Sequence, residues 1–448
     1  MGDVRGTRPV STLFVIGTRP EAIKVLPVIL ELVRRRRYDV RIVSTGQHPE
    51  LVAEVLALGG LKPDFTLPSS GPNRTLSRLF ADVMLGLTDV LGSFGPPTPT
   101  VHGTPPPGTP ASVFVHGDTT SAAAAALAAF HYAVPVVHIE AGLRTSNTLS
   151  PFPEELNRQL ISRIAALHFA PTFRNKENLT REGIEGGRVF VSGNTAIDAL
   201  LFASSLDVPY EDPQLADLDD DPRRVVVVTA HRRENWGEPI ERIAESIAEL
   251  AKARPLVRFV VAMHPNPAVQ QVIRGKLDHL DNVSVVGPMG YVSFARLLRR
   301  SWLVMTDSGG IQEEAPALGK PVILLRETTE RQEGVDAGTV LLVGSDSAKI
   351  LQTTRELLDD PREYARRAAL VDPYGDGQAA RRIIDACEHV LFDTPEPAQF
   401  GGALDRLAVL RAGGYTEDPK DFRDPDTSWD VATGTVEVQD PFIHSSNG

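Results

Sequence analysis

The chain has 448 residues, 42% of them hydrophobic, which is enough for two or three domains with buried cores. The formal net charge of -12 argues against nucleic acid or an anionic membrane surface as a partner. The single cysteine, Cys387, excludes an intramolecular disulfide and multi-cysteine zinc sites. The apolar stretch near the N-terminus is too short for a signal peptide, and no apolar run approaches 18 residues. We therefore expect a cytoplasmic protein with no membrane span and no bound metal.

Apolar, β-branched runs alternate with amphipathic helical patterns along most of the chain. In chain order the runs are TLFVIG, VRIVST, SVFVHG, VPVVHIE, RVFVSG, RVVVVTA, VRFVVAMH, NVSVVG, WLVMTD and PVILL. Nearly continuous apolar strands separated by helices indicate parallel sheets that are covered on both faces. There are too many such units for one doubly wound sheet. The sequence therefore predicts an α/β protein with two Rossmann-like domains that face each other across a cleft.

The domain boundaries follow from changes in composition. We expect one domain over residues 10–195, completed by a closing helix over 378–391, and a second domain over 200–371. A segment rich in Asp and Pro, residues 200–221, is the expected linker. We also expect a Pro/Gly/Thr-rich surface loop over 92–110 and an acidic, partly disordered tail over 392–448.

The segment Asp307–Pro316, DSGGIQEEAP, directly follows the apolar run WLVMT. A strand thus runs into a Ser308-Gly309-Gly310 turn that opens a helix. Such a turn directs backbone N–H groups and the positive end of the helix dipole at a ligand, and a phosphate is the natural one. Glu313 or Glu314, one turn inside the helix, is placed to accept ribose hydroxyls.

Ligands of open α/β sheets bind beyond the carboxyl ends of the strands, so the residues after each run are the candidates. The first run leads into GTRPEAIK, residues 17–24, where Arg19 and Lys24 could reach the cleft as positive charges. A helix start with solvated charges is the simpler alternative. The dinucleotide fingerprint GxGxxG is absent, which argues against NAD.

Three carboxylates follow runs of the first half. Asp118 comes after SVFVHG, where it could also be a helix N-cap. Glu140 directly follows the buried strand VPVVHI, and a carboxylate at the end of a buried strand is harder to explain by a purely structural role than Asp118 is. Glu154 lies in PFPEELNR together with Glu155 and Arg158, although acids in a first helical turn also favour the dipole.

In the second half, two histidines and an arginine stand out. His231 follows RVVVVTA in a stretch, HRREN, that has nothing apolar to bury an imidazole, so a solvated loop histidine is the alternative. His264 ends VRFVVAMH and begins the rigid turn HPNP. Arg331, in RETTERQEG, could clamp a phosphate or form an exposed salt bridge.

Together these residues form an anion cradle with cations, carboxylates and a histidine. A G-x-S-x-G elbow and a P-loop are both absent, which argues against a nucleophile triad and against NTP hydrolysis. Carboxylates gathered in a cleft of low dielectric raise one another's pKa, which leaves one protonated acid and one ionised base. Such a pair suits proton abstraction and return at carbon.

At this point the sequence resembles the non-hydrolysing bacterial UDP-N-acetylglucosamine 2-epimerases. The matching stretches are GTRPEAIK, TGQH, HGDTTS, HIEAGLRT, PFPEELNR, GN at 193–194, HRREN, HPNP, DSGGIQEEAP, GKPV, RETTER and DPYGDG, in order over roughly residues 12–391. The resemblance implies two Rossmann-like domains of glycosyltransferase-B type, a homodimer and no redox cofactor. It also implies elimination of UDP to 2-acetamidoglucal and re-addition with inversion at C2, so that N-acetylglucosamine becomes N-acetylmannosamine.

The resemblance assigns roles to residues of this chain. The acid/base carboxylates fall on Asp118, Glu140 and Glu154, and the catalytic histidine on His231. The groups around the UDP-sugar fall on Arg19, Lys24, Arg158, Ser308, Gly309, Gly310, Glu314 and Arg331. A second, activating UDP-N-acetylglucosamine site of many bacterial members would involve Gln47, His48, Arg232 and His264.

The chain departs from the family pattern at two places within these motifs. Pro49 stands after TGQH, where the family usually has a basic residue, and the family's ERPE reads Glu330-Arg331-Gln332-Glu333. Three other functions remain open: a hydrolysing relative that releases free N-acetylmannosamine and UDP, a glycosyltransferase on the same fold, and a non-catalytic nucleotide-sugar sensor.

Overall fold

In the computed structural model of the chain, the residues described are 9–69, 71, 74–95, 109–230, 232–263, 266–329, 331–368, 373–400, 427–429 and 436–438. The predicted site residues His231 and His264 lie outside these ranges, as do most of the 92–110 segment and most of the tail.

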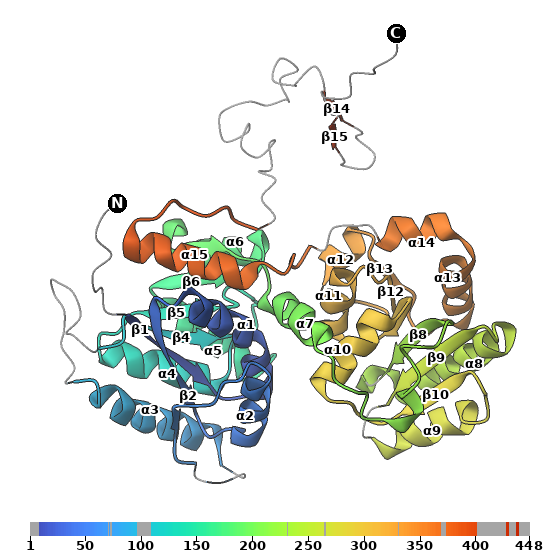
Figure 1. Cartoon of the computed structure of the whole chain (residues 1–448), viewed down its shortest axis with the longest axis horizontal. Helices are drawn as coiled ribbons and strands as arrows, with labels where there is room; N and C mark the ends of the chain where they lie inside the picture. The colour runs from blue at the N-terminus through green and yellow to red at the C-terminus, as the bar shows by residue number, and fades with distance from the viewer. Residues whose placement is uncertain are drawn as a thin grey trace. The chain divides into compact units, whose positions relative to one another are not determined.

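The first sheet is parallel and has the strand order β3-β2-β1-β4-β5-β6-β7. Figure 1 labels β1, β2, β4, β5 and β6 of this sheet. Its strands are β1 (Val10–Ile16), β2 (Tyr38–Ser44), β3 (Phe65–Thr66), β4 (Ser112–His116), β5 (Val136–Ile139), β6 (Leu167–Ala170) and β7 (Val189–Val191). Its helices are α1 (Arg19–Arg35), α2 (Pro49–Ala57), α3 (Leu76–Gly92), α4 (Thr120–His131), α5 (Glu154–Ile164), α6 (Phe173–Arg181) and, near the end of the lobe, α15 (Ala379–Phe392), with a 3-10 turn at Gly186–Arg188.

Helices cover both faces of this sheet because successive side chains of a strand point to opposite faces. In β1, Leu13 and Val15 pack into a core with α3, α4 and α5, whereas Phe14 and Ile16 pack into a second core with α1, α2 and α15. The strands are therefore largely apolar, as the runs predicted for a doubly covered parallel sheet.

The second sheet is also parallel, with the order β10-β9-β8-β11-β12-β13. Its strands are β8 (Arg224–Thr229), β9 (Val257–Ala262), β10 (Val283–Val286), β11 (Leu303–Thr306), β12 (Val322–Leu324) and β13 (Val340–Leu342). The helices that follow in this lobe are α8 (Glu238–Ala253), α9 (Pro267–Leu277), α10 (Tyr291–Arg300), α11 (Gly309–Ala317), α12 (Gln332–Asp336), α13 (Ser347–Asp359) and α14 (Pro361–Ala368), with 3-10 turns at Pro213–Leu215 and Arg233–Asn235. Val226 and Val228 pack against α8, α9 and α13, and Val225 and Val227 pack toward α10 and α11.

Helix α7 (Thr195–Ser205) joins the two sheets. It packs against α1 of the first lobe and against α10 of the second, and it lies between them in Figure 1. The expected linker over 200–221 is thus wrong in its first residues, because Leu200–Ser205 complete this helix. Leu200 and Ala203 are buried in the core of the second lobe, and that burial keeps the segment helical.

The predicted fold class, two parallel-sheet α/β domains, is confirmed. The sequence reading missed the short strands β3, β6 and β13. In the tail, β14 (Thr427–Trp429) pairs antiparallel with β15 (Val436–Val438) as a separate unit. Among the helices that the structure describes, none is long and apolar enough to cross a membrane.

Candidate active site

The strand order reverses at one point in each sheet, and the predicted motifs lie at these points. In the first sheet the order turns between β1 and β4, which are followed by the 17–24 and 117–121 turns. In the second it turns between β8 and β11, which are followed by Arg232 and by the 307–310 turn. Ligands of doubly wound sheets bind in the crevice at this switch point.

The turn after β1 is built around a buried carboxylate. Thr18 is the N-cap of α1, and Glu21 completes a capping box with it. Glu21 also accepts hydrogen bonds from the Gly17 N–H at 3.1 Å and from the Thr119 hydroxyl at 2.8 Å. This contact ties the turn after β1 to the turn after β4. Burial raises the pKa of Glu21 to about 7 despite these hydrogen bonds.

Lys24 of α1 and Glu140, at the end of β5, form an ion pair. The Lys24 Nζ lies 2.5 Å from the Glu140 Oε2. Burial opposes the charge on both groups, but their attraction outweighs it, so the pKa of Lys24 is raised and that of Glu140 is lowered to about 2. Glu140 is therefore ionised at neutral pH.

The backbone and surroundings of Glu140 are also unusual. Its φ is +63°, a left-handed conformation that residues other than glycine adopt rarely and that often marks functional positions. The Nε2 of buried His116 lies 3.7 Å from its carboxylate. Because burial lowers the pKa of His116 to about 3, this ring is neutral at pH 7. Lys24 thus supplies the positive charge beside Glu140.

Asp118 lies in the turn after β4, and three side chains contact Asp118 or its neighbour Gly117. Arg158 of α5 contacts its carboxylate, with 2.6 Å between Nη2 and Oδ2. The Asn157 amide donates to the Asp118 carbonyl at 2.8 Å, and the His138 Nε2 lies 2.7 Å from the Gly117 carbonyl. Burial raises the pKa of Asp118, and Arg158 only partly offsets that. Asp118 is not the N-cap of α4, because Thr119 occupies that position.

The pKa values of two carboxylates are therefore separated, but by a different route from the one we expected. The sequence predicted that the carboxylates would raise one another's pKa. Burial is the main cause at Asp118, with the charge of Glu140 adding to it, whereas Lys24 lowers the pKa of Glu140. The result is still one carboxylate held ionised and one pushed toward its protonated form, as acid/base pairs require.

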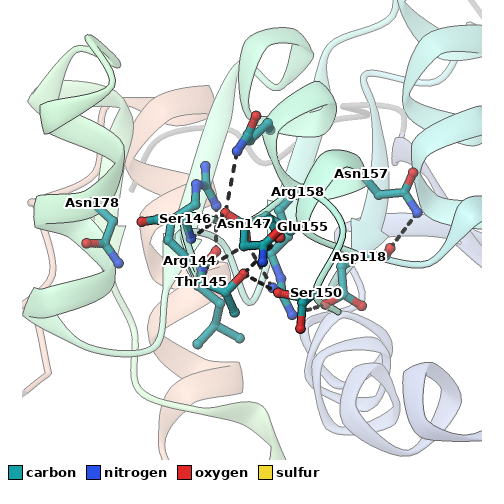
Figure 2. Close-up of polar contacts among 12 residues, drawn as sticks. Asp118, Arg144, Thr145, Ser146, Asn147, Ser150, Glu155, Asn157, Arg158 and Asn178 are labelled. Carbon is teal, nitrogen blue, oxygen red and sulfur yellow. Dashed lines mark hydrogen bonds and ion pairs between the residues drawn. The ribbon is translucent and has the colours of Figure 1, made fainter. Parts of the chain in front are cut away.

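Helix α5 presents Glu154 and Glu155 in its first turn. Glu155 is fully buried and accepts hydrogen bonds from the backbone N–H groups of Thr145 and Ser146 and from Arg158 (Figure 2). Within the described part of the chain, one oxygen of Glu154, Oε2, is buried without a hydrogen-bond partner. A substrate hydroxyl or proton would satisfy that oxygen.

The turn after β11 has the predicted strand-turn-helix form. Ser308 is the N-cap of α11, which begins at Gly309. A Cβ at position 309 would lie 2.7 Å from the Arg331 Nη1 and 3.3 Å from the Arg232 Nη2, so both guanidinium groups closely approach the backbone of this turn. Two cations therefore stand beside the helix N-terminus, which is the arrangement for a diphosphate.

Two glutamates of α11 have different partners. Glu313 accepts from Arg331 Nε at 2.5 Å and from the Asn194 amide at 2.8 Å, so it connects the second lobe with the turn after β7. Burial, with the charge of Glu313 adding to it, raises the pKa of Glu314 to about 7.

A cavity of about 450 Å³ collects these groups from both lobes. Its lining includes the predicted site residues Lys24, Glu140, Arg158, Gly310, Glu314 and Arg331. Asp118 is not part of the lining, but it contacts Arg158, which is. The lining does not include Arg19, Glu154, Ser308 and Gly309, although Ser308 and Gly309 directly precede Gly310.

The residues predicted for a second ligand site come from both lobes, and His264 lies outside the described residues. The Gln47 amide oxygen accepts from Ser121, and the His48 N–H donates to the Gly17 carbonyl, so both lie beside the turn after β1. Arg232 lies at Gly309 in the other lobe, where its backbone N–H donates to Asp307.

Several residues of the site were missed by the sequence reading as candidates: Glu21, His116, His138, Asn157 and Asn194. Only Glu21 had a sequence signal, since T-R-P-E fits a capping box. Among the residues that the structure describes, no group of three or more His, Cys, Asp or Glu side chains could hold a metal ion.

Comparison with known proteins identifies relatives over most of the chain. The profile of a family described as UDP-N-acetylglucosamine 2-epimerase matches residues 30–388. A UDP-N-acetylglucosamine 2-epimerase of Neisseria meningitidis is 44% identical over 377 residues, which are 83% of this chain and 98% of the relative. One of Escherichia coli K12 is 40% identical over 383 residues, 84% of this chain and 98% of that protein. A crystal structure of the Neisseria meningitidis enzyme bound to UDP-GlcNAc has a TM-score of 0.74 and 41% identity, and covers 84% of this chain and 99% of its own.

Proposed function

Because this chain belongs to the UDP-N-acetylglucosamine 2-epimerase family, we propose that it is a non-hydrolysing epimerase that interconverts UDP-N-acetylglucosamine and UDP-N-acetylmannosamine. The observation that carries the proposal is the cavity in which Lys24, Glu140 and Arg158 of one lobe face Glu314 and Arg331 of the other. The first group suits proton transfer at a sugar carbon, and the second suits a nucleoside diphosphate.

The proposed reaction needs only groups that this site supplies. A carboxylate removes the proton from C2, a C1–C2 double bond forms, and the C1–O bond breaks with its electron pair leaving on UDP. Re-addition reverses these steps with the proton delivered to the opposite face, so nothing is oxidised or reduced. Asp118, Glu140 and Glu154 are the proposed acid/base groups, and His231 is proposed as the catalytic histidine from the sequence motif.

The diphosphate is proposed to lie at the N-terminus of α11. The N–H groups of this turn and the guanidinium of Arg331 would stabilise the charge that develops on the departing UDP. Ser308, Gly309 and Gly310 would contact phosphate, and Glu314 would accept ribose hydroxyls. Arg19, Lys24 and Arg158 would complete the positive surroundings. Keeping UDP beside the glucal makes re-addition effectively unimolecular.

The remaining sequence predictions are proposed together with this function. Residues 10–195, completed by 378–391, would form the domain with the acid/base groups, and residues 200–371 the UDP-binding domain. The protein would be a cytoplasmic homodimer without a redox cofactor. Gln47, His48, Arg232 and His264 are kept as the residues of a second UDP-N-acetylglucosamine site.

Proton NMR of the purified protein with UDP-N-acetylglucosamine in deuterated water tests the proposal. We expect UDP-N-acetylmannosamine to appear and deuterium to enter C2 of both sugars. Substantial free N-acetylmannosamine with UDP would identify a hydrolysing enzyme instead. Absence of C2 exchange, together with sugar transfer to an added acceptor, would identify a glycosyltransferase.

A further inference from the structure

We propose that Glu155, a residue outside the cavity lining, is a positioning residue that sets the catalytic geometry of Asp118 through Arg158. This inference rests on the proposed epimerase function. It concerns a fully buried carboxylate, adjacent in sequence to the proposed acid/base residue Glu154, that accepts hydrogen bonds from Thr145 and Arg158 of the cavity wall.

The first step is the bridge made by Arg158. Its Nη1 donates to Glu155 Oε2 at 3.0 Å, and its Nη2 lies 2.6 Å from Asp118 Oδ2. The guanidinium is planar and its donors have fixed directions, so anchoring one nitrogen orients the other. The position of the Asp118 carboxylate is thereby tied to a group that substrate does not displace.

The second step is the loop that Glu155 holds. Its oxygens accept from the Thr145 N–H at 3.0 Å and the Ser146 N–H at 3.3 Å, and the Thr145 hydroxyl donates to the Ser150 carbonyl at 2.7 Å (Figure 2). Thr145 lines the cavity, as does Arg158. One carboxylate therefore organises two parts of the cavity wall at the end where Glu140 lies.

The third step is the charge of Glu155. Burial alone would oppose its ionisation, but the hydrogen bonds from Thr145, Arg158 and Ser146 outweigh this effect and lower its pKa. Ionised Glu155 balances the charge that Arg158 shares with Asp118. Removing one carboxylate partner of a largely buried arginine leaves part of its charge uncompensated, which is destabilising.

The experiment compares Glu155→Gln with the wild-type protein by steady-state kinetics and by calorimetric titration with UDP. The glutamine keeps the size of the side chain but removes the charge that holds Arg158. We expect turnover at saturating substrate to fall about 10²-fold, since small misplacements of catalytic groups have effects of this size. The dissociation constant of UDP should change less than about twofold, because Glu155→Gln leaves Arg158 its charge and does not touch Arg331 or the N-terminus of α11. Normal turnover in Glu155→Gln would overturn the inference.

A double-mutant cycle separates positioning from general damage. If Glu155 acts through Arg158, then Glu155→Gln should add little to the loss already caused by Arg158→Ala, and the two effects should be strongly non-additive. Additive losses would overturn the inference. Glu388→Gln is the matched control, because Glu388 also pairs with a buried arginine, Arg35, but on α15 away from the cavity. Its turnover should stay within about twofold of the wild type.

Arg158→Lys keeps the inference testable if Glu155→Gln does not fold. A lysine retains the charge beside Asp118 but cannot bridge two carboxylates with a rigid fork. We expect it to lose turnover without loss of UDP affinity, and full activity would contradict the proposal. Wild-type protein without epimerase activity would instead refute the proposed function, so the two failures are distinguishable.

Discussion

Single residues gain their chemistry here from partners that are distant in the sequence. The carboxylate of Glu140 lies 2.5 Å from the Nζ of Lys24, a residue 116 positions earlier in the chain. Lys24 is the largest of the influences that outweigh burial and lower the pKa of Glu140. Asp118, whose arginine partner only partly offsets its burial, has a raised pKa instead.

Replacing Lys24 by methionine should therefore change the pH dependence of the reaction. Without the cation, burial raises the pKa of Glu140 above its ordinary value, so the ionised form is lost as the pH falls through a higher range. We expect the acidic limb of the kcat/KM profile between pH 5 and 9 to move upward, with activity partly restored at high pH. An acidic limb at the same pH as in the wild type would show that Lys24 does not keep Glu140 ionised. Lys276→Met, which breaks an exposed pair with Glu245, is the control.

The acid/base carboxylates should respond differently from the nucleotide-binding groups. We expect Glu140→Gln and Asp118→Asn each to lower turnover by about 10²-fold or more, as loss of a general acid or base does. UDP affinity, measured by calorimetry, should stay nearly unchanged. Near-normal turnover in either variant would show that its assigned role is wrong.

At the scale of elements, the ends of strands and the beginnings of helices place the site residues. The turn after β4 is fixed because His138 on β5 contacts the Gly117 carbonyl, and Gly117 has a φ of +65° that suits glycine. The turn after β11 is fixed because α11 begins at Gly309, where Arg331 approaches the backbone.

His138→Leu should loosen the turn that carries Asp118. The leucine leaves the buried Gly117 carbonyl without its donor, at a cost of about 1–3 kcal/mol in the free energy of unfolding. We expect lower turnover and a lower melting temperature, with both partly restored in His138→Gln, whose amide can donate. His131→Leu, at the exposed end of α4, should change neither quantity. Equal defects in the leucine and glutamine variants would argue against the hydrogen bond as the cause.

The pH dependence of stability gives a second readout of His138. Burial lowers its pKa to about 4, against 6.5 for a free histidine. The unfolded chain therefore binds the proton first as the pH falls. The contribution of the neutral ring to stability is complete above about pH 6.5 and is lost as the pH drops toward 4. His138→Gln should remove this part of the acid sensitivity.

Arg331→Ala tests the helix terminus as a diphosphate site. The loss of a charge-assisted hydrogen bond to phosphate should raise the dissociation constant of UDP about 10- to 100-fold. Arg174→Ala is the control, because Arg174 is exposed and contacts Glu333 only at 3.8 Å. An unchanged UDP dissociation constant in Arg331→Ala would refute the proposed role of Arg331 in binding the diphosphate.

At the scale of the whole molecule, the site exists because two lobes contribute to one cavity. Asn194, after β7, donates to Glu313 of α11, and its backbone N–H donates to the Tyr374 carbonyl in the segment that returns to the first lobe. Helix α7 packs against helices of both lobes. These contacts determine how far the carboxylates of one lobe stand from the helix terminus of the other.

The proposed homodimer is a prediction at this same scale. Leu156 and Leu160, one helical turn apart on α5, are exposed by 45% and 44%, as an unfilled contact surface would be. Light scattering should give twice the chain mass of 48.6 kDa. The double variant Leu156→Glu/Leu160→Glu should be monomeric, and Leu256→Glu, at an exposed leucine of the second lobe, should not. A monomeric wild-type protein would contradict the prediction.

Local pattern in the sequence was sufficient for most of the strands, although not for β3, β6 and β13, and for the parallel arrangement and the motifs at the strand ends. Apolar runs report burial on both faces, and the residues that follow them fall at the ligand-binding edge whatever the details of packing. For this reason the turns after β1, β4, β5 and β11 were predicted, and the family could be identified from them.

Only the tertiary structure decided which of these groups meet and in which charge state. The Lys24–Glu140 pair, the bridge from Glu155 through Arg158 to Asp118, and the double packing of α7 join segments that are far apart in the chain. Such contacts depend on strand order and helix orientation, which local pattern does not encode. The pKa of a buried carboxylate depends in turn on those neighbours, so the chemistry of the site is determined by the fold.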